Sequence, residues 1–144
     1  MSTHFRWIAL AAVVVASIAL ADETPGAAKS TPIVSSGAEV YGTICQGCHM
    51  PNGQGAEGAG HYPKLAGNVN FVSWQFIALT VLNGRNGMPP FGLQGTDVRQ
   101  LRTAQLSDAQ IADVVNYVRT HFGNNYASKV TAKDVATLTH PGIR

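Results

Sequence analysis

Apolar residues recur at the spacing of one helix face in three stretches of this 144-residue chain. The three sets are Val40, Tyr41, Ile44 and Cys45; Phe71, Trp74, Ala78 and Leu82; and Ile111, Val114, Val115, Val118 and Phe122. Ser35 or Ser36 can cap the first stretch, and Asn83-Gly84 supplies a stop after the second. The third follows a capping box at Ser107–Gln110 and ends at Gly123. The pattern therefore predicts about three core helices, with no alternation of strands and helices.

Glycine and proline interrupt the chain between these stretches. Residues 50–60 are too rich in glycine for a helix or a strand, and residues 85–92 contain two prolines and two glycines. The polar segment 95–104 predicts a short surface helix with Val98 and Leu101 turned inward. The chain is therefore expected to form an all-α domain with long loops.

The first residues predict export from the cytoplasm. His4 and Arg6 precede an apolar run over 7–20, and Ala19-Leu20-Ala21 is a small-residue cleavage pattern. The run is short for a membrane span, which needs about 20 residues, so a retained anchor is the weaker interpretation. The predicted segments are a signal peptide (1–21), a flexible leader (22–34), one domain (35–123) and an extended C-terminal tail that packs only partly on the domain (124–144).

Composition limits the partners that the chain can attract by charge. The formal net charge is +2, and removal of residues 1–21 takes away Arg6 and no acid, so that it becomes +1. Lysines and arginines are scattered singly, which argues against a nucleic-acid-binding stripe. We therefore expect weak electrostatic steering of any partner.

The segment Cys45-Gln46-Gly47-Cys48-His49 has the C-x-x-C-H spacing of a c-type haem attachment site. Two cysteines three residues apart on a helical turn face the same way, so both thiols can add to the two vinyl groups on one edge of a porphyrin. His49 is then carried under the ring, where its Nε2 atom can bind iron. The motif predicts one covalently bound haem c.

Other interpretations of these features are weaker. A zinc site needs four ligands, and Cys45 and Cys48 are the only cysteines in the chain. A thioredoxin-like dithiol would need a βαβ context, which the pattern does not show. The glycine-rich run 52–60 lacks the preceding strand and the G-K-[ST] ending of a phosphate-binding loop.

Iron bound by His49 alone would have one open face. The candidates for the sixth ligand are Met50, Met88, His61, His121 and His140. Met50 adjoins the proximal histidine and would lie on the wrong side of the ring. Met88 stands in a loop stiffened by Pro89 and Pro90, and it belongs to no apolar helix face. We predict that Met88 is the sixth ligand.

Four segments follow one another in the order and spacing typical of a known family: C-Q-G-C-H, P-K-L-A-G, N-G-M-P-P-F and the helix I-A-D-V-V-N-Y-V. Over about residues 36–123 the chain resembles class I cytochrome c. The resemblance is greatest to the monohaem cytochrome subunits or electron acceptors of periplasmic quinoprotein and flavoprotein dehydrogenases. It implies the cytochrome c fold, with core helices around a covalent haem and with Gly37 and Tyr41 in contact with Tyr117.

The resemblance also implies roles for residues around the haem. The Pro63 carbonyl would orient His49 through Nδ1, and Leu65 would pack on the porphyrin. The segment 92–105 is longer than the usual connection, and the tail 124–144 is extra, so both bear on where a partner docks. Lys64 and Arg85 are interpreted as solvated surface cations rather than partners of the haem propionates.

The function implied is transfer of single electrons in the periplasm, without catalysis and without a small-molecule substrate. A periplasmic dehydrogenase would be the donor, and a downstream cytochrome or terminal oxidase the acceptor. Two alternatives stay open. One is an obligate haem subunit of a dehydrogenase complex, and the other is a haem enzyme or sensor with an open distal site.

Overall fold

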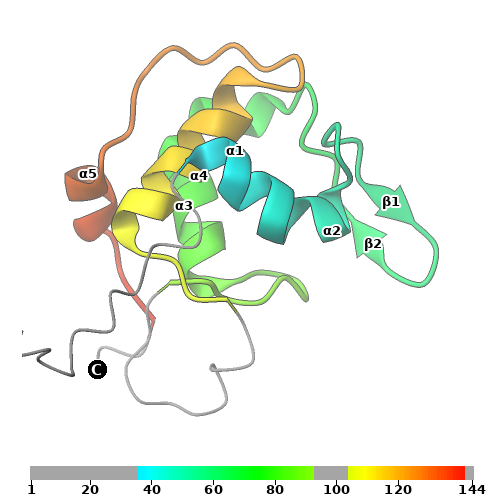
Figure 1. Ribbon diagram of the computed structural model, residues 1–144, viewed down its shortest axis with the longest axis horizontal. Helices are drawn as coiled ribbons and strands as arrows, with labels where there is room; N and C mark the ends of the chain where they lie inside the picture. Colours follow the sequence, from blue (N-terminus) through cyan, green and yellow to red (C-terminus); the bar gives the residue numbers. More distant parts are fainter. Residues whose placement is uncertain (1–35, 93–103, 142–144) are drawn as a thin grey trace, which may run out of the picture. The chain divides into compact units, whose positions relative to one another are not determined.

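Helices packed around α4 (Asp108–Thr120) form the body of the described part of the domain (Figure 1). The structure is a computed structural model that describes residues 36–92 and 104–141. Helix α1 (Gly37–Val40) packs against α4, and α4 also packs against α3 (Trp74–Asn83) and α5 (Ala132–Ala136). The predicted signal peptide and leader, and almost all of the predicted surface helix at 95–104, lie outside the described residues. None of the described helices is long and apolar enough to cross a membrane.

The first helical segment runs without a break from Gly37 to His49. Ser36 caps it, since its hydroxyl accepts a hydrogen bond from the Glu39 amide and the Glu39 carboxylate accepts one from the Ser36 amide. Between α1 and α2 (Gln46–His49) lies η1 (Tyr41–Cys45), which is π-helical. The apolar spacing predicted the helix but not this wider turn, which directly precedes the C-x-x-C-H motif.

Gly37 allows α1 to approach α4 very closely. A Cβ atom at this position would lie 2.1 Å from the Asp113 carbonyl oxygen and 2.9 Å from the Tyr117 Cβ atom. The rings of Tyr41 and Tyr117 are 5.5 Å apart between centroids. The contact implied by the family resemblance is therefore present, and it fixes the helix that ends in His49.

The second predicted helix starts later than its apolar pattern indicates. Helix α3 begins at Trp74, where the Ser73 hydroxyl accepts a hydrogen bond from the Phe76 amide. Phe71 belongs instead to a preceding 3-10 turn, η2 (Val69–Val72), and is buried there. The helix ends at Asn83, as predicted, because Gly84 adopts a φ of 72°.

The third predicted helix ends earlier than its apolar pattern indicates. Helix α4 stops at Thr120, and Phe122 has a φ of 59° in the turn beyond it. This turn places the Phe122 ring 4.8 Å from that of Tyr41. Phe122 therefore reaches the core from a turn rather than from the helix face.

The tail, predicted to be extended and only partly packed, contains a short helix and two buried valines. The segment after Gly123 contains α5, and Val130 and Val135 are only 3% and 0% exposed. Asn116 on α4 donates to the Val130 carbonyl at 2.7 Å and accepts from the Val130 amide at 2.8 Å. Val130 and Val135 of the tail are thus part of the core.

Candidate functional site

A cavity of about 630 Å³ opens between the helices and the loops that connect them. Its walls are largely apolar and include Ile44, Phe71, Ile77, Val81, Phe91, Val114 and Val118. All six residues predicted to hold the cofactor also line it: Cys45, Cys48, His49, Pro63, Leu65 and Met88. Its volume is within the range of about 300–1,000 Å³ that is usual for cofactor sites. An apolar cleft with two thiols, an imidazole and a thioether fits the donor set and the shape that a covalent haem needs.

His49 is held in a defined orientation at the end of α2. The residue is 8% exposed, and its Nδ1 atom lies 2.9 Å from the Pro63 carbonyl oxygen. A carbonyl can only accept, so Nδ1 carries the proton and the lone pair is on Nε2. This is the tautomer that a metal-binding histidine requires.

The glycine-rich loop brings Pro63 to His49. Strands β1 (Ala56–Glu57) and β2 (His61–Tyr62) pair in an antiparallel ladder within it, where the sequence predicted only loop. Gly55 has a φ of 69°, and a Cβ atom there would lie 2.3 Å from the Tyr62 carbonyl oxygen and 2.9 Å from the Pro63 carbonyl carbon. The loop can therefore close on Pro63 only with glycine at this position.

The two cysteines are free thiols in the structure. Burial, with a smaller contribution from the nearby Cys48, raises the pKa of the Cys45 thiol to about 12. A thiol with such a pKa is protonated at neutral pH, which does not suit a redox dithiol that acts as a thiolate. Among the described residues there is no group of three or more metal-ligating side chains of the His, Cys, Asp and Glu types. The structure therefore favours neither the disulfide nor the zinc interpretation.

Met88 directly follows a tight turn and forms an isolated β-bridge with Arg85 across it. The Arg85 amide donates to the Met88 carbonyl at 3.0 Å, and the Met88 amide donates to the Arg85 carbonyl at 2.9 Å. Asn86 and Gly87 between them have φ values of 48° and 90°. Positive φ at both central residues is typical of a type I′ turn, for which Asn-Gly is the strongest sequence signal. That signal was present in the sequence and predicts the turn.

The other four candidates for the sixth ligand are placed differently. His61 lines the cavity, but its side chain is 73% exposed and pairs with Glu57. Met50 is outside the cavity lining, and its carbonyl accepts a hydrogen bond of 2.6 Å from Tyr41. His121 stacks on Tyr117, and His140 binds Asp108. Of the five candidates, only Met88 and His61 line the cavity.

Asn124 fixes one wall of the cavity and was not identified from the sequence. It is 6% exposed, donates to the carbonyls of Leu65 and Val118, and accepts from the Asn68 amide at 2.9 Å. Two of these partners lie more than fifty residues away along the chain. No local pattern around Asn124 indicates such contacts.

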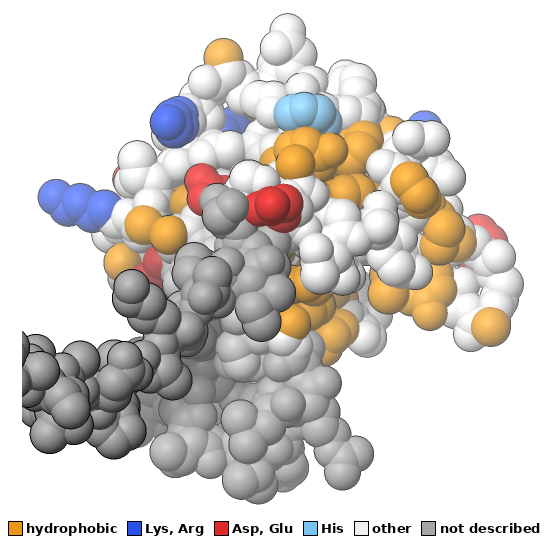
Figure 2. Space-filling model, in the orientation of Figure 1, with side chains coloured by type: hydrophobic (Ala, Val, Ile, Leu, Met, Phe, Trp, Pro, Cys, Tyr) orange, Lys and Arg blue, Asp and Glu red, His pale blue; other side chains and the backbone are white. Residues whose placement is uncertain are grey.

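Five large apolar side chains among the described residues are exposed in segments that line the cavity. Val69, Val72 and Leu79 on η2 and α3 are 76%, 68% and 37% exposed, and Phe76 and Tyr62 are both exposed and line the cavity. The chain from residue 65 to residue 84 contains no charged residue. Figure 2 shows hydrophobic side chains in several patches on the face it draws, with Lys and Arg side chains dispersed toward its margins. We call Tyr62, Val69, Val72, Phe76 and Leu79 the apolar face.

The two surface cations near the cavity differ in position. Arg85 lines the cavity, with its guanidinium carbon 5.3 Å from the centre of the Phe76 ring. Lys64 does not line it. Arg85 is therefore better placed than Lys64 to meet a negatively charged group at the cavity rim.

The fold and the cavity define a small helical protein with one covalent haem attachment motif, and comparisons with known proteins agree. The family model for cytochrome c matches residues 34–122. Cytochrome c-552 of Thermus thermophilus is 34% identical over 117 residues, which cover 72% of this chain and 84% of that protein. The chain therefore belongs to the cytochrome c family. A cytochrome c domain carries covalently bound haem c, so the predicted family, fold and cofactor are confirmed.

Several longer relatives are cytochrome subunits of dehydrogenases. The gluconate 2-dehydrogenase cytochrome c subunit of Pantoea cypripedii is 38% identical over 110 residues, and the alcohol dehydrogenase (quinone) cytochrome c subunit of Gluconacetobacter polyoxogenes is 37% identical over 108. The alignments cover 72% and 74% of this chain but only 24% and 23% of those proteins. The chain thus corresponds to about a quarter of each subunit.

Proposed function

We propose that this chain is an exported carrier of single electrons that receives them from a periplasmic dehydrogenase and passes them to a downstream cytochrome or terminal oxidase. Cys45 and Cys48 form the two thioether bonds to the haem, and His49 and Met88 are its axial ligands. When bound, the haem supplies an iron that alternates between Fe(III) and Fe(II). Pro63 and Leu65 are the remaining predicted contacts.

One observation carries the proposal: residues from three separate segments of the chain, predicted from their motifs, line the same cavity. The C-x-x-C-H helix supplies two thiols and an imidazole with Nε2 free to coordinate. The turn at 85–88 supplies a thioether held by two backbone hydrogen bonds. These are the groups that a low-spin, six-coordinate haem requires.

The protein's own residues keep such a site rigid and dry. The Pro63 carbonyl holds the His49 ring, so no reorientation is needed when the iron changes charge. The turn around Met88 is fixed by its backbone, and the apolar walls exclude water. A site that changes little between two oxidation states is suited to electron transfer rather than to substrate turnover.

The proposed donor docks on the apolar face. This face is continuous with the cavity through Phe76 and Tyr62, so a partner covering it would come within a short distance of the haem. Since residues 65–84 carry no charge and Arg85 lies over the Phe76 ring at one side of the face, the matching surface on the donor should be largely apolar. The dehydrogenase subunits among the relatives support a donor of that class.

A permanent subunit of a dehydrogenase is the second candidate. The relatives named as subunits are about four times as long as the aligned part, so this chain corresponds to one portion of such a protein. Purification from the native host distinguishes a free carrier from a permanent subunit. A free carrier elutes alone at the size of one domain, whereas a permanent subunit elutes with a dehydrogenase at high salt.

The intact mass of the purified protein tests the central proposal. We expect a chain beginning at Asp22 with one haem added, and colour that stays with the protein in acidified acetone, because thioether bonds do not dissociate. A mass equal to the bare polypeptide, or haem that is extracted, would contradict covalent attachment through Cys45 and Cys48. A chain that retains residues 1–21 would contradict the predicted cleavage alone.

A further inference from the structure

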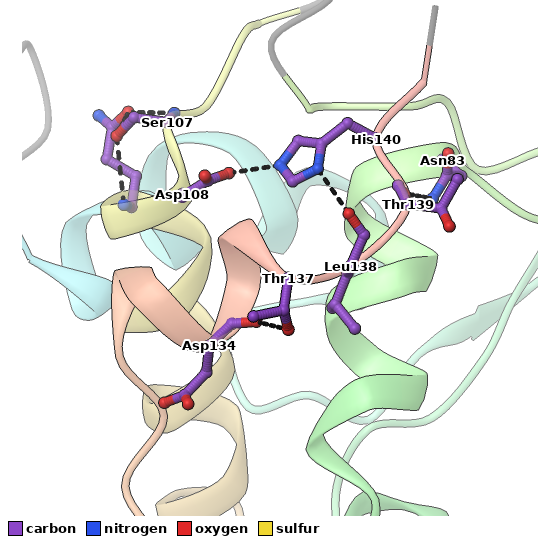
Figure 3. Close-up of polar contacts among 9 residues, drawn as sticks. Asn83, Ser107, Asp108, Asp134, Thr137, Leu138, Thr139 and His140 are labelled. Carbon is purple, nitrogen blue, oxygen red and sulfur yellow. Dashed lines mark hydrogen bonds and ion pairs between the residues drawn. The ribbon is translucent and has the colours of Figure 1, made fainter. Parts of the chain in front are cut away.

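His140, near the end of the C-terminal segment, has hydrogen-bond acceptors on both ring nitrogens (Figure 3). Nε2 lies 2.7 Å from the Asp108 Oδ1 atom, and Nδ1 lies 2.8 Å from the Leu138 carbonyl oxygen. A carbonyl and a carboxylate can only accept. A neutral imidazole has a single N–H and can satisfy one of them, whereas the imidazolium satisfies both. The contacts therefore require His140 to be protonated.

The segment 138–141 that His140 holds in place contacts both ends of the loop that carries Met88. At the first end, the Asn83 side chain donates to the Thr139 carbonyl at 3.1 Å, and Asn83 is the last residue of α3 (Figure 3). At the other end, a Cβ atom on Gly92 would lie 3.2 Å from the Pro141 ring. The segment thus bridges the base of the loop.

The Met88 loop packs tightly against Gly84 and against the end of α3, where the loop begins. A Cβ atom on Gly84 would lie 2.5 Å from the Met88 carbonyl oxygen and 2.8 Å from the Pro90 nitrogen. The Phe91 amide donates to the Val81 carbonyl at 2.9 Å, and the Gly92 amide donates to the Leu82 carbonyl at 3.1 Å. A shift of either end of the loop would therefore move the backbone of Met88.

The charged groups around His140 are few among the described residues. Asp108, in the first turn of α4, is its ion-pair partner. The Asp134 carboxylate on α5 points away from His140 (Figure 3). It accepts hydrogen bonds from the amide and hydroxyl of Thr131. Lys133 is on α5 beside it, and α3 carries no charged residue. Asp108 therefore dominates the electrostatic environment of the ring.

We propose that His140, as an imidazolium, is a positioning residue that holds segment 138–141 against both ends of the Met88 loop, and that loss of its proton loosens this loop. The inference rests on the proposed role of Met88. Deprotonation leaves one ring nitrogen with its lone pair facing an oxygen, either that of Asp108 or that of Leu138, so one contact breaks. The link from α4 to the base of the loop is then weakened, although the fold persists.

Amide hydrogen exchange of the holoprotein, measured against pH, tests the proposal. The probes are the hydrogen-bonded amides of Arg85, Met88 and Phe91. After correction for the intrinsic pH dependence of exchange, we expect their protection to fall about tenfold as His140 loses its proton, because one hydrogen bond at the base of the loop is lost. NMR titration of the His140 ring in the reduced protein locates that proton loss independently.

The variant His140→Gln should show low protection at every pH, with the pH dependence removed. His121→Gln is the matched control, since His121 is exposed and does not line the cavity, and it should retain the wild-type profile. Protection that stays constant in the wild type while the His140 ring titrates would overturn the proposal. So would a His140→Gln variant that keeps wild-type protection.

A second signal separates this inference from the role of Met88 itself. The oxidised protein should show the weak red absorption band of a thioether bound to Fe(III), and its intensity should decline with the same pH midpoint as the amide protection. If the band is missing at every pH, then Met88 is not a ligand, and this part of the proposed function is contradicted. The exchange data would still decide whether His140 holds the loop.

Discussion

The Nδ1 atom of His49 lies 2.9 Å from the carbonyl oxygen of Pro63, fourteen residues further along the chain. The contact joins the end of the C-x-x-C-H helix to the exit of the glycine-rich loop. It fixes both the tautomer and the orientation of the ring, and a hydrogen-bonded imidazole is also a more basic iron ligand. The conformation of a loop therefore affects the properties proposed for the haem.

Gly55→Ala should disturb this relationship. The new Cβ atom would collide with the Tyr62 and Pro63 backbone, and φ at this position is positive. We expect a loss of about 3 kcal/mol in the free energy of unfolding, from steric overlap and strain together. Gly67→Ala is the control, because φ there is +62° but no atom lies within 4 Å, so only the strain of about 1 kcal/mol applies. Denaturant unfolding measures both free energies. Equal losses in the two variants would show that the loop adjusts to the Gly55→Ala side chain without a steric penalty.

Met88→Ala should open the sixth coordination position. Loss of the thioether should lower the reduction potential by on the order of 100 mV and let carbon monoxide bind the reduced protein rapidly. Met50→Ala should change neither property, since Met50 does not line the cavity. Potentiometry and stopped-flow mixing with carbon monoxide provide the measurements. Rapid binding by the wild type would instead favour a haem enzyme or sensor, with His61 near the open side.

Val135→Ala should destabilise the domain although it lies beyond the region expected to fold. Val135 is completely buried, so removing two methyl groups should cost about 2 kcal/mol. Val69→Ala removes the same atoms from a side chain that is 76% exposed and should change stability by less than about 0.5 kcal/mol. Chemical denaturation of both holoproteins tests this. A Val135→Ala protein as stable as the wild type would show that α5 is not part of the cooperative unit.

Electron transfer from the donor should depend weakly on salt. Because the mature chain has a small formal charge and the apolar face has none, the bimolecular rate should change by less than about tenfold between low and physiological ionic strength. Val72→Ser on this face should slow the reaction, whereas Val130→Thr, at a buried position within the tail, should affect stability instead. Rates that fall by several powers of ten with salt would point to a charged docking surface elsewhere.

The stability that His140 contributes should decrease with rising pH. The hydrogen bond and charge of Asp108 raise the pKa of His140 above its ordinary value. A folded-state pKa above the unfolded one means that the contribution is complete below the ordinary histidine pKa and disappears as pH rises through the raised value. We therefore expect His140→Gln to be less stable than the wild type by about 1–2 kcal/mol in mild acid. The difference in free energy of unfolding should shrink toward alkaline pH, and a difference that grows with pH would contradict the assignment.

The sequence by itself determined the features that depend on neighbouring residues. The C-x-x-C-H motif has its two thiols and imidazole within five residues, so its chemistry is visible without a fold. The capping boxes at Ser36 and Ser107 and the stop at Gly84 are equally local, and each is present in the structure. The Asn86-Gly87 turn was encoded in the same way.

Only the tertiary structure decided which distant residues support the site. Asn124 binds the backbone at Leu65 and Asn68, and His140 binds Asp108, 32 residues away, because packing of the helices brings these segments together. The tail looked polar since Val130 and Val135 are isolated apolar residues, and a five-residue helix is too short to show a period. Periodicity records which face of a long element is buried, whereas a single side chain that closes a gap leaves no pattern in the chain.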